Sequence, residues 1–340
     1  MFISRGVDHI IRLTAVEIRP EAQIRIAAAG PVSSVRFRPD GARLLANASG
    51  VRRWDVPDGE CVPAVIKAPR YQRADYSRSG RYFSAAGQGG GVFEDATGKQ
   101  LDPLVPSVIS QDVAFSPDER LVAVAHVGGV SVWNLQSGKK AFDIDPRDTR
   151  EHHVGAVAFS PDGGYLAAGT FISNSGKLDG FGTVTIWDVR TAQRVRTFPG
   201  ENCGIWRLAW SPDGRHLAVA AGVHFISRGT AKVWDVTTGK LVYDLKGHTE
   251  CVWGVSFSPD GRRLVTCSGS RTGRPPETNG ELKLWDMDTG LELLGLTENK
   301  ATVFDVAFSP DGRWLGAGYA DGKIRIWDLG RQTGLASLSN

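Results

Sequence analysis

Few residues of the chain have both the type and the spacing that chemistry requires. His152 and His153 could ligate a metal, but neighbouring residues on a strand face opposite ways, and no cysteine pair has zinc-site spacing. Asp143, Asp145 and Asp148 resemble a calcium loop, yet the required glycine and closing glutamate are missing. The sequence therefore predicts neither a metal centre nor any other cofactor.

Motifs for phosphate and acyl-transfer chemistry are also missing. Every Gly-Lys pair precedes Gln, Lys, Leu or Ile, so none completes the phosphate loop GxxxxGK[ST]. Neither GxSxG nor HExxH occurs. Six aspartates recur at one position of a repeated turn, which marks them as turn residues and not catalytic carboxylates: Asp40, Asp118, Asp162, Asp213, Asp260 and Asp311. We expect a protein that is not an enzyme.

The composition is that of an ordinary globular protein. Of 340 residues, 41% are hydrophobic and 23% are charged, which argues against wholesale disorder. Forty Lys and Arg against 37 Asp and Glu give a net charge of +3, too balanced for an obligate polyanion binder. No apolar run approaches the ~20 residues of a membrane helix. We therefore expect no membrane association.

The N-terminus and the cysteines indicate a reducing compartment. An acid, Asp8, stands where a secretion signal would be apolar, so we expect a cytoplasmic protein. The four cysteines are too few for a disulfide framework. Cys203 and Cys251 begin equivalent strands of neighbouring repeats, where a disulfide is geometrically conceivable but a reduced pair is favoured.

Two short phrases recur along the chain. The first is an apolar residue followed by Ser-Pro-Asp-Gly or a variant, and its seven copies are 39 to 51 residues apart. Its apolar residues are Phe37, Tyr76, Phe115, Phe159, Trp210, Phe257 and Phe308. The second is Trp-Asp or a variant, at Trp54, Phe93, Trp133, Trp187, Trp234, Trp285 and Trp327. Self-similarity at this period predicts a repeat architecture.

Each repeat is predicted to form four strands. Residues before the second phrase alternate, as in 323–327, which is typical of a strand with one buried face. In the turn, Pro presets φ, Asp bonds to its own backbone, and Gly takes a positive φ. Along the first strand, alternate positions are large and the intervening ones are often small, such as Ala209, Ser256 and Ala307. This pattern suits an inner strand crowded on one side.

With these phrases the chain resembles the WD40-repeat family over roughly residues 31–330. Its low cysteine content and its many Pro-Asp-Gly turns resemble those of bacterial members. The resemblance implies an all-β, seven-bladed β-propeller of four-stranded antiparallel blades, a single domain over 1–340. The expected repeats are 31–69, 70–108, 109–152, 153–202, 203–249, 250–300 and 301–340. Residues 1–30 would supply an N-terminal hairpin whose strand Ile24–Ala28 closes the last blade. The segment Gly334–Leu338 is the alternative closing strand.

The family's hydrogen-bonded tetrad of His, Ser or Thr, Asp and Trp is matched only in part. The sole Gly-His pair contains His248, and its repeat has Thr266 and Trp285 but Asn279 in place of Asp. The last repeat has Asp321 and Trp327 but Ala317 at the hydroxyl position. Tetrads should be mostly absent. The residues expected to have structural roles are Trp54, Trp133, Trp187, Trp234, His248, Thr266, Trp285, Asp321 and Trp327.

Length changes concentrate in three adjacent repeats. The two phrases are 17 to 19 residues apart in four repeats but 24 to 28 apart in the fourth, fifth and sixth. The additions, 171–182, 223–229 and 269–280, fall between the second and third strands, on one face of a propeller. Either surface loops merely tolerate insertion, or this sector binds a partner. The residues predicted for that partner site are Phe171, Lys177, His224, Phe225, Arg228, Trp253, Arg271, Arg274 and Phe304.

Trp206, Trp253 and Phe304 share one position at the entrance of the first strand. They form either an aromatic cluster at the channel rim or packing between blades.

Three functions compete. The leading hypothesis is a monomeric, non-enzymatic scaffold for protein partners of unknown identity, since arginine with aromatics is typical of binding hot spots. The alternative is a small-molecule binder or enzyme that uses the central channel, for which His152, His224, His248 and Glu250 are the candidates. Nucleic-acid binding through the arginine-bearing loops is disfavoured by the net charge.

Overall fold

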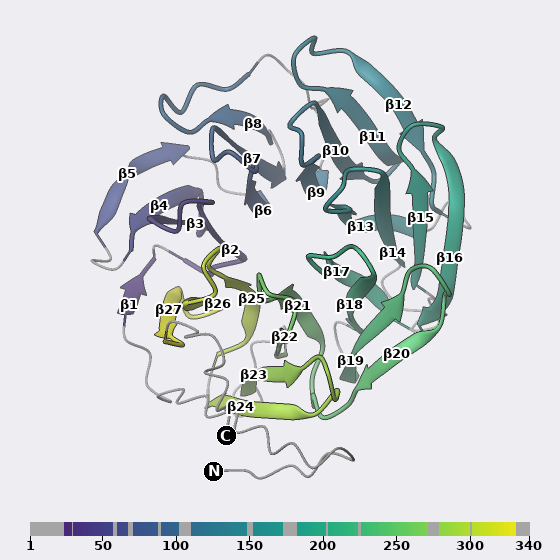
Figure 1. The fold of residues 1–340 in the computed structure, drawn as a ribbon. Coiled ribbons are helices and arrows are strands. Elements are labelled where there is room, and N and C mark those ends of the chain that lie inside the picture. Colours follow the sequence, from purple (N-terminus) through teal and green to yellow (C-terminus); the bar gives the residue numbers. More distant parts are fainter. Residues whose placement is uncertain are drawn as a thin grey trace, which may run out of the picture.

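The structure is a computed structural model that describes residues 24–28, 30–56, 60–66, 71–87, 90–101, 110–147, 152–172, 182–201, 203–223, 226–270, 279–299 and 301–330. These residues form strands, turns and loops without helix, and so contain no helix that could cross a membrane. The strands make seven sheets arranged around a central axis, a seven-bladed β-propeller (Figure 1). The predicted fold class is confirmed.

Blades one to three are built in chain order from the inside outward. Blade one contains β2 (Ser34–Phe37), β3 (Arg43–Asn47), β4 (Val51–Asp55) and β5 (Cys61–Ile66). Blade two contains β6 (Tyr71–Tyr76), β7 (Tyr82–Gly87) and β8 (Gly91–Glu94), and a bridge from Phe93 to Gln100 follows. Blade three contains β9 (Ser110–Phe115), β10 (Leu121–His126), β11 (Gly129–Asn134) and β12 (Lys140–Ile144).

The longest strands belong to blades four to six, and blade seven takes its outer strand from the N-terminal part of the described chain. Blade four contains β13 (His152–Phe159), β14 (Tyr165–Ile172), β15 (Gly182–Asp188) and β16 (Gln193–Glu201). Blade five contains β17 (Gly204–Trp210), β18 (His216–Val223), β19 (Ile226–Asp235) and β20 (Leu241–Leu245). Blade six contains β21 (Val252–Phe257), β22 (Arg263–Ser268), β23 (Asn279–Asp286) and β24 (Glu292–Asn299). Blade seven contains β25 (Val303–Phe308), β26 (Trp314–Tyr319), β27 (Lys323–Asp328) and β1 (Ile24–Ala27).

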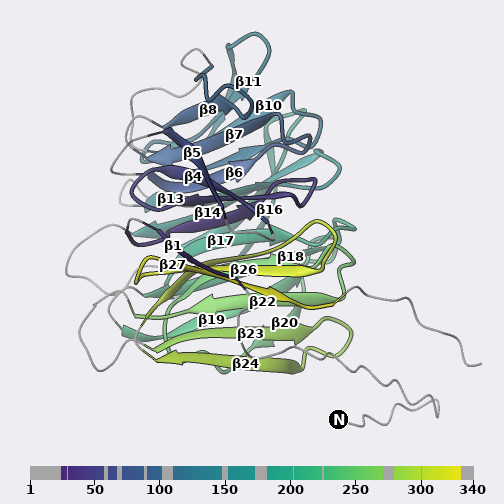
Figure 2. The same ribbon diagram turned by 90° about the vertical axis from the view of Figure 1, so that its left-hand side faces the viewer.

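The inner strands close the ring. β2, β6, β9, β13, β17, β21 and β25 each contact the next in that order, and β25 contacts β2 again. Figure 1 places all seven around the central channel, and Figure 2 shows the sheets edge-on. We call the face where inner strands begin the entrance face. The opposite face, where the Ser-Pro-Asp-Gly turns lie, is the turn face.

The last blade is completed by the N-terminal part of the chain. β1 pairs antiparallel with β27, with Ile24 opposite Ile326 and Ala27 opposite Lys323. The buried Ile26 joins Ile324, Val35 and Phe37 in one apolar cluster between blades seven and one. The closing strand is therefore the N-terminal one, as expected. The alternative, Gly334–Leu338, lies outside the described residues.

The two repeated phrases build the turns. In blade six Asp260 accepts hydrogen bonds from the Ser258 hydroxyl at 2.5 Å and from the Arg262 amide at 3.1 Å. Gly261 follows with a φ of 70°. The aspartate of Trp-Asp acts in the same way, because Asp235 accepts from the amide of Thr238 at 2.6 Å and its hydroxyl at 2.8 Å. Both aspartates satisfy backbone donors of their own turns.

The expected loop over residues 223–229 is largely strand, which corrects the sequence interpretation. β18 continues to Val223 and β19 begins at Ile226, and these two residues pair. Added residues that extend a ladder keep their backbone hydrogen bonds, whereas a bare loop would need other partners. The extra length in blade five is thus a taller hairpin at the entrance face.

Candidate functional site

Six inner strands start with a break in register. The shifts fall between Tyr71 and Arg73, Ser110 and Asp112, Val154 and Ala156, Ile205 and Arg207, Val252 and Gly254, and Val303 and Asp305. Such a bulge adds one residue and re-aims its side chain. Strict alternation along β17 would put Trp206 on the same side as Leu208, and the bulge between Ile205 and Arg207 breaks that alternation.

Three of the re-aimed residues, Trp206, Trp253 and Phe304, continue a row of rings on the entrance face that begins in blade four. We call His153, Phe171, Trp206, Trp253 and Phe304 the aromatic row. Ring centroids are 5.5 Å apart for His153 and Phe171, 5.1 Å for Phe171 and Trp206, 5.3 Å for Trp206 and Trp253, and 6.0 Å for Trp253 and Phe304. The row crosses blades four to seven without a gap.

The indole nitrogens of the row are already bonded. Trp206 Nε1 donates to the carbonyl of Gly222 at 2.8 Å, and Trp253 Nε1 donates to that of Gly269 at 2.7 Å. Trp253 is 6% exposed, whereas the other four side chains are partly exposed. Fixed rings with partial exposure can offer rigid apolar surface at low entropic cost.

The structure describes only part of the predicted partner site. Phe171, Trp253 and Phe304 come together in the aromatic row. Lys177, His224, Phe225, Arg271 and Arg274 lie outside the described residues, and so does the side chain of Arg228. Their part in binding remains a prediction.

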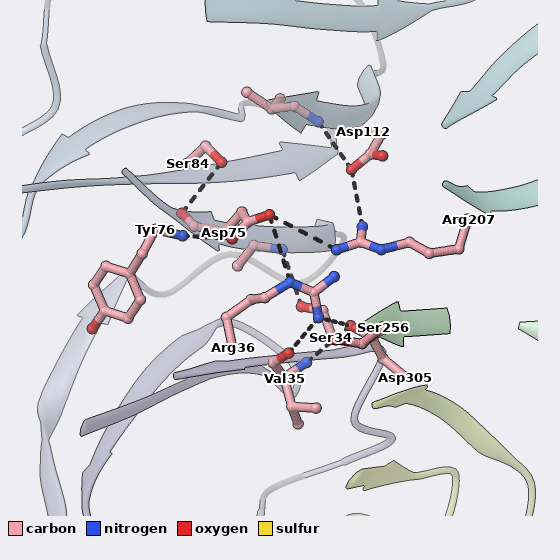
Figure 3. A network of polar contacts seen from close by, with 12 residues as sticks. Ser34, Val35, Arg36, Asp75, Tyr76, Ser84, Asp112, Arg207, Ser256 and Asp305 are labelled. Atoms are coloured by element: carbon pink, nitrogen blue, oxygen red, sulfur yellow. Dashed lines mark hydrogen bonds and ion pairs between the residues drawn. The ribbon is translucent and has the colours of Figure 1, made fainter. Parts of the chain in front are cut away.

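The central channel holds a network of charges that sequence reasoning missed. We call Arg36, Arg73, Asp75, Asp112, Arg207 and Asp305 the channel network. Arg36 lies 2.8 Å from Asp305 and 3.5 Å from Asp75. Arg207 lies 3.5 Å from Asp112 and 3.8 Å from Asp75 (Figure 3).

These contacts span the ring. Arg207 extends from β17 of blade five to blades two and three on the other side, as Figure 3 shows. Arg73 crosses in the reverse direction and donates to the carbonyl of Trp206. Three guanidinium groups and three carboxylates therefore bridge the channel with balanced charge.

Burial sets the ionisation of the carboxylates. It raises the pKa of Asp112 to about 6, although the charge of Arg73 and a hydrogen bond from the Val157 amide act in the opposite direction. Burial also raises the pKa of Asp75, and Arg36 opposes the rise. Removing a carboxylate from water disfavours its charged form, and paired cations and hydrogen-bond donors compensate.

A sequence signal for the network existed. Counted back from the apolar residue of each turn phrase, Arg73, Asp112, Arg207 and Asp305 stand at the third position and Arg36 and Asp75 at the first. These are the intervening positions that were expected to be often small. Side chains at these two positions of the inner strand face the channel. Charged residues at these positions in five repeats therefore indicated a charged channel.

One of the histidines proposed for the channel, His248, does not line it. His248 lies inside blade six, with Nε2 2.6 Å from the Thr266 hydroxyl and Nδ1 2.9 Å from Glu281. Trp285 Nε1 donates to the same Thr266 oxygen at 2.8 Å. The tetrad expected to be incomplete because of Asn279 is thus completed by Glu281, two residues further along β23.

The hydrogen bonds determine which atoms of this tetrad donate and which accept. Burial lowers the pKa of His248, so the ring is neutral. An ionised carboxylate only accepts and an indole only donates. His248 Nδ1 therefore donates to Glu281, the Thr266 hydroxyl donates to Nε2, and Trp285 donates to Thr266. In other blades, Trp133 and Trp327 have indole nitrogens without a hydrogen-bond partner among the described residues.

The described part of the chain holds no cluster of three or more His, Cys, Asp or Glu residues suited to a metal ion. Cys203, Cys251 and Cys267 are buried.

Comparison with known proteins agrees with this geometry. The family described as WD domain, G-beta repeat matches residues 145–178, 192–235, 239–286 and 292–328. These matches end on or beside the Trp-Asp phrases of blades five, six and seven. The chain is a WD40-repeat β-propeller.

Individual relatives of this WD40 propeller match over part of its length. It is 26% identical over 199 residues to the transcriptional corepressor LEUNIG_HOMOLOG of Arabidopsis thaliana, and the aligned region covers 57% of the chain and 23% of the relative. It is 32% identical over 202 residues to WD repeat-containing protein SL1-17 of Schistosoma mansoni, covering 59% and 44%. WD repeat and SOCS box-containing protein 1 of Takifugu rubripes is 44% identical over 52 residues, 15% of the chain and 12% of the relative. The chain thus spans less than half the length of these relatives.

Proposed function

We propose that this WD40 propeller is a non-enzymatic scaffold that binds a protein partner on the entrance face of blades four to six. The observation that carries the proposal is the aromatic row, which continues from His153 to Phe304 across four blades. Rigid aromatic side chains are enriched where protein interfaces concentrate their binding energy.

The surroundings of the row support this use. The chain is longest between the second and third strands of the same blades, and the described strands that lead into these connections end at Ile172, Val223 and Ser268 on the entrance face. The connections contain Arg271 and Arg274, and arginine combines with aromatics at binding hot spots. One relative is named as a transcriptional corepressor and another for a SOCS box, and neither name denotes an enzyme.

The channel network supports the non-enzymatic part of the proposal. The carboxylates that face the described channel are paired with guanidinium groups. Guanidinium is protonated at every physiological pH and cannot serve as a general base. An arrangement of this kind holds the blades together.

The test compares two matched arginine pairs. The double variant Arg271→Ala, Arg274→Ala removes two charges from the connection between β22 and β23. The control Arg215→Ala, Arg262→Ala removes the same charge from exposed positions in the turns of blades five and six, on the turn face. Both baits, and the wild type, are used for affinity capture with mass spectrometry and then for titration of the captured partner.

A scaffold that works through this face loses its partner in the first variant and keeps it in the control. Phe304→Ala should weaken the same partner, because it shortens the aromatic row at one end. Equal binding by all baits would move the site away from the entrance face. Absence of any saturable protein partner would overturn the scaffold itself.

A further inference from the structure

A cavity of about 360 Å³ opens from the turn face into the channel. Its walls are mainly apolar and include Phe159, Trp210, Phe257 and Phe308. Arg36 and Arg207 are the charged residues among those that line it. The volume lies in the range of small-molecule sites, which are mostly apolar with a few convergent polar groups.

Unequal side chains around the ring create this space. At the position directly before the apolar residue of the turn phrase, blades one and two carry Arg36 and Asp75. Ala158, Ala209 and Ala307 occupy the same position in blades four, five and seven. The charged groups therefore fill one side of the channel, and the small residues leave the other side open.

The guanidinium of Arg207 is incompletely paired. Its contacts with Asp112 and Asp75, at 3.5 and 3.8 Å, are long for charge-assisted hydrogen bonds, which measure ~2.7–2.9 Å. Arg36 is better held, at 2.8 Å from Asp305. Arg207 can therefore donate short hydrogen bonds to an anion that enters the cavity, at little cost to the pairs already present.

The charge balance of the channel network limits the charge that such an anion can carry. The channel network contains three arginines and three aspartates, so it accommodates one added negative charge more readily than two. The aspartates at the mouth are held in their own turns, as Asp162 is by the Ser160 hydroxyl and the Gly164 amide. Apolar walls favour an organic anion over inorganic phosphate.

We propose that the cavity on the turn face binds a small monocarboxylate with an aromatic or branched apolar body. The carboxylate lies against Arg207 and Arg36, and the apolar body packs against the aromatic walls. This site is separate from the entrance face and does not depend on the proposed scaffold function.

Isothermal titration calorimetry with three acid and amide pairs tests the proposal. The probes are benzoate with benzamide, phenylacetate with phenylacetamide, and 3-methylbutanoate with 3-methylbutanamide. We expect at least one acid to bind with a Kd of ~1 mM or tighter, and its amide at least ~10-fold more weakly because the ionic hydrogen bonds are lost. If no acid binds at ~10 mM, or if each amide matches its acid, the proposal is wrong.

Two kinds of variant locate the binding. Arg207→Gln should weaken the acid ~10-fold, and Arg215→Gln, on an exposed turn of the same blade, should leave its Kd unchanged. Ala209→Leu fills the cavity and keeps every charge, so it should abolish binding while circular dichroism shows an intact fold. Ala158→Leu repeats this test from blade four. Acid binding that survives both filling variants would place the ligand elsewhere and overturn the assignment.

Discussion

Glu281 shows how one side chain replaces another in a hydrogen-bonded unit. It accepts from His248 and from the amide and hydroxyl of Thr249, at 2.9, 3.1 and 2.6 Å. A glutamate is one methylene longer than an aspartate, so it reaches His248 from two residues further along the strand. Trp285, Thr266 and His248 then form the same chain of donors and acceptors that an aspartate would complete.

Glu281→Gln should remove a pH-dependent part of the stability. Burial alone would raise the pKa of Glu281, but the hydrogen bonds from His248 and Thr249 overcome it and set the pKa at about 2, below the ordinary 4.5. The stabilisation is therefore present above pH 4.5 and is lost as the pH falls through 2. We expect the variant to be about 1–2 kcal/mol less stable at pH 7 and to lose less on acidification, in urea unfolding.

Glu292→Gln is the matched control for this measurement. Glu292 pairs with Lys283 at 2.8 Å on the exposed side of the same blade. Exposed ion pairs contribute about 0–1 kcal/mol. Equal effects of the two variants would show that the tetrad carries no special stability.

Asp112→Asn should change the pH dependence in the opposite sense. Burial raises the pKa of Asp112 from 3.8 to about 6. Between these two pH values the folded state keeps a proton on this carboxyl group, whereas the unfolded state has lost it. This contribution is fully present below pH 3.8 and is lost as the pH rises through 6. In urea unfolding from pH 4 to 7, the variant should lack that decline. A decline as steep as in the wild type would show that Asp112 is not the titrating group.

At the scale of the elements, each Pro-Asp-Gly turn rests on the turn before it. A Cβ built on Gly163, Gly214, Gly261 or Gly312 would lie 3.4 to 3.7 Å from the proline of the preceding blade. The turn therefore needs a left-handed residue but has room for a methyl group. Glu119 is the exception, with a φ of 58°, and its carboxylate accepts hydrogen bonds from Ser79 of the preceding blade.

Gly163→Ala should cost about 1 kcal/mol of unfolding free energy, because the φ of 74° is unfavourable for a residue with a Cβ. Gly164→Ala is the control one residue away. Gly164 has no left-handed φ, and its added methyl group would meet only Asp162 at 3.4 Å and beyond. Urea unfolding of the two variants separates backbone strain from steric contact. Equal costs would show that space, and not φ, selects glycine in this turn.

The elements also show what the sequence can and cannot predict. Seven blades and their turns follow from repeated phrases, because local turn chemistry and alternation recur in every repeat. The N-terminal closing strand is expected from the resemblance to the WD40 family. The aromatic row depends on bulges at Trp206, Trp253 and Phe304, and a break in register leaves no mark in the spacing of apolar residues. The contact between Arg207 and Asp112 joins residues 95 positions apart. Such pairs form only when the ring closes.

At the scale of the whole molecule, stability depends on one seam. Six blades consist of consecutive strands, whereas blade seven takes β1 from the other end of the described chain. The pairing of β1 with β27 therefore links both ends of the ring, while the inner strands β2 and β25 meet at the same place. A ring opened there would expose two blade faces to water at once, since the cluster around Ile26 contains residues of blades one and seven.

Ile26→Ala should therefore destabilise the propeller by about 2–4 kcal/mol through the cavity that it leaves in this cluster. Arg25→Ala, an exposed neighbour on the same strand, should change the stability by less than about 0.5 kcal/mol. Hydrogen exchange distinguishes a seam from a local defect. If β1 closes the ring, amides of β27 and of β2 exchange faster together in Ile26→Ala, because both lose protection when the seam opens. Faster exchange confined to β1 would mean that the ring stays closed without it.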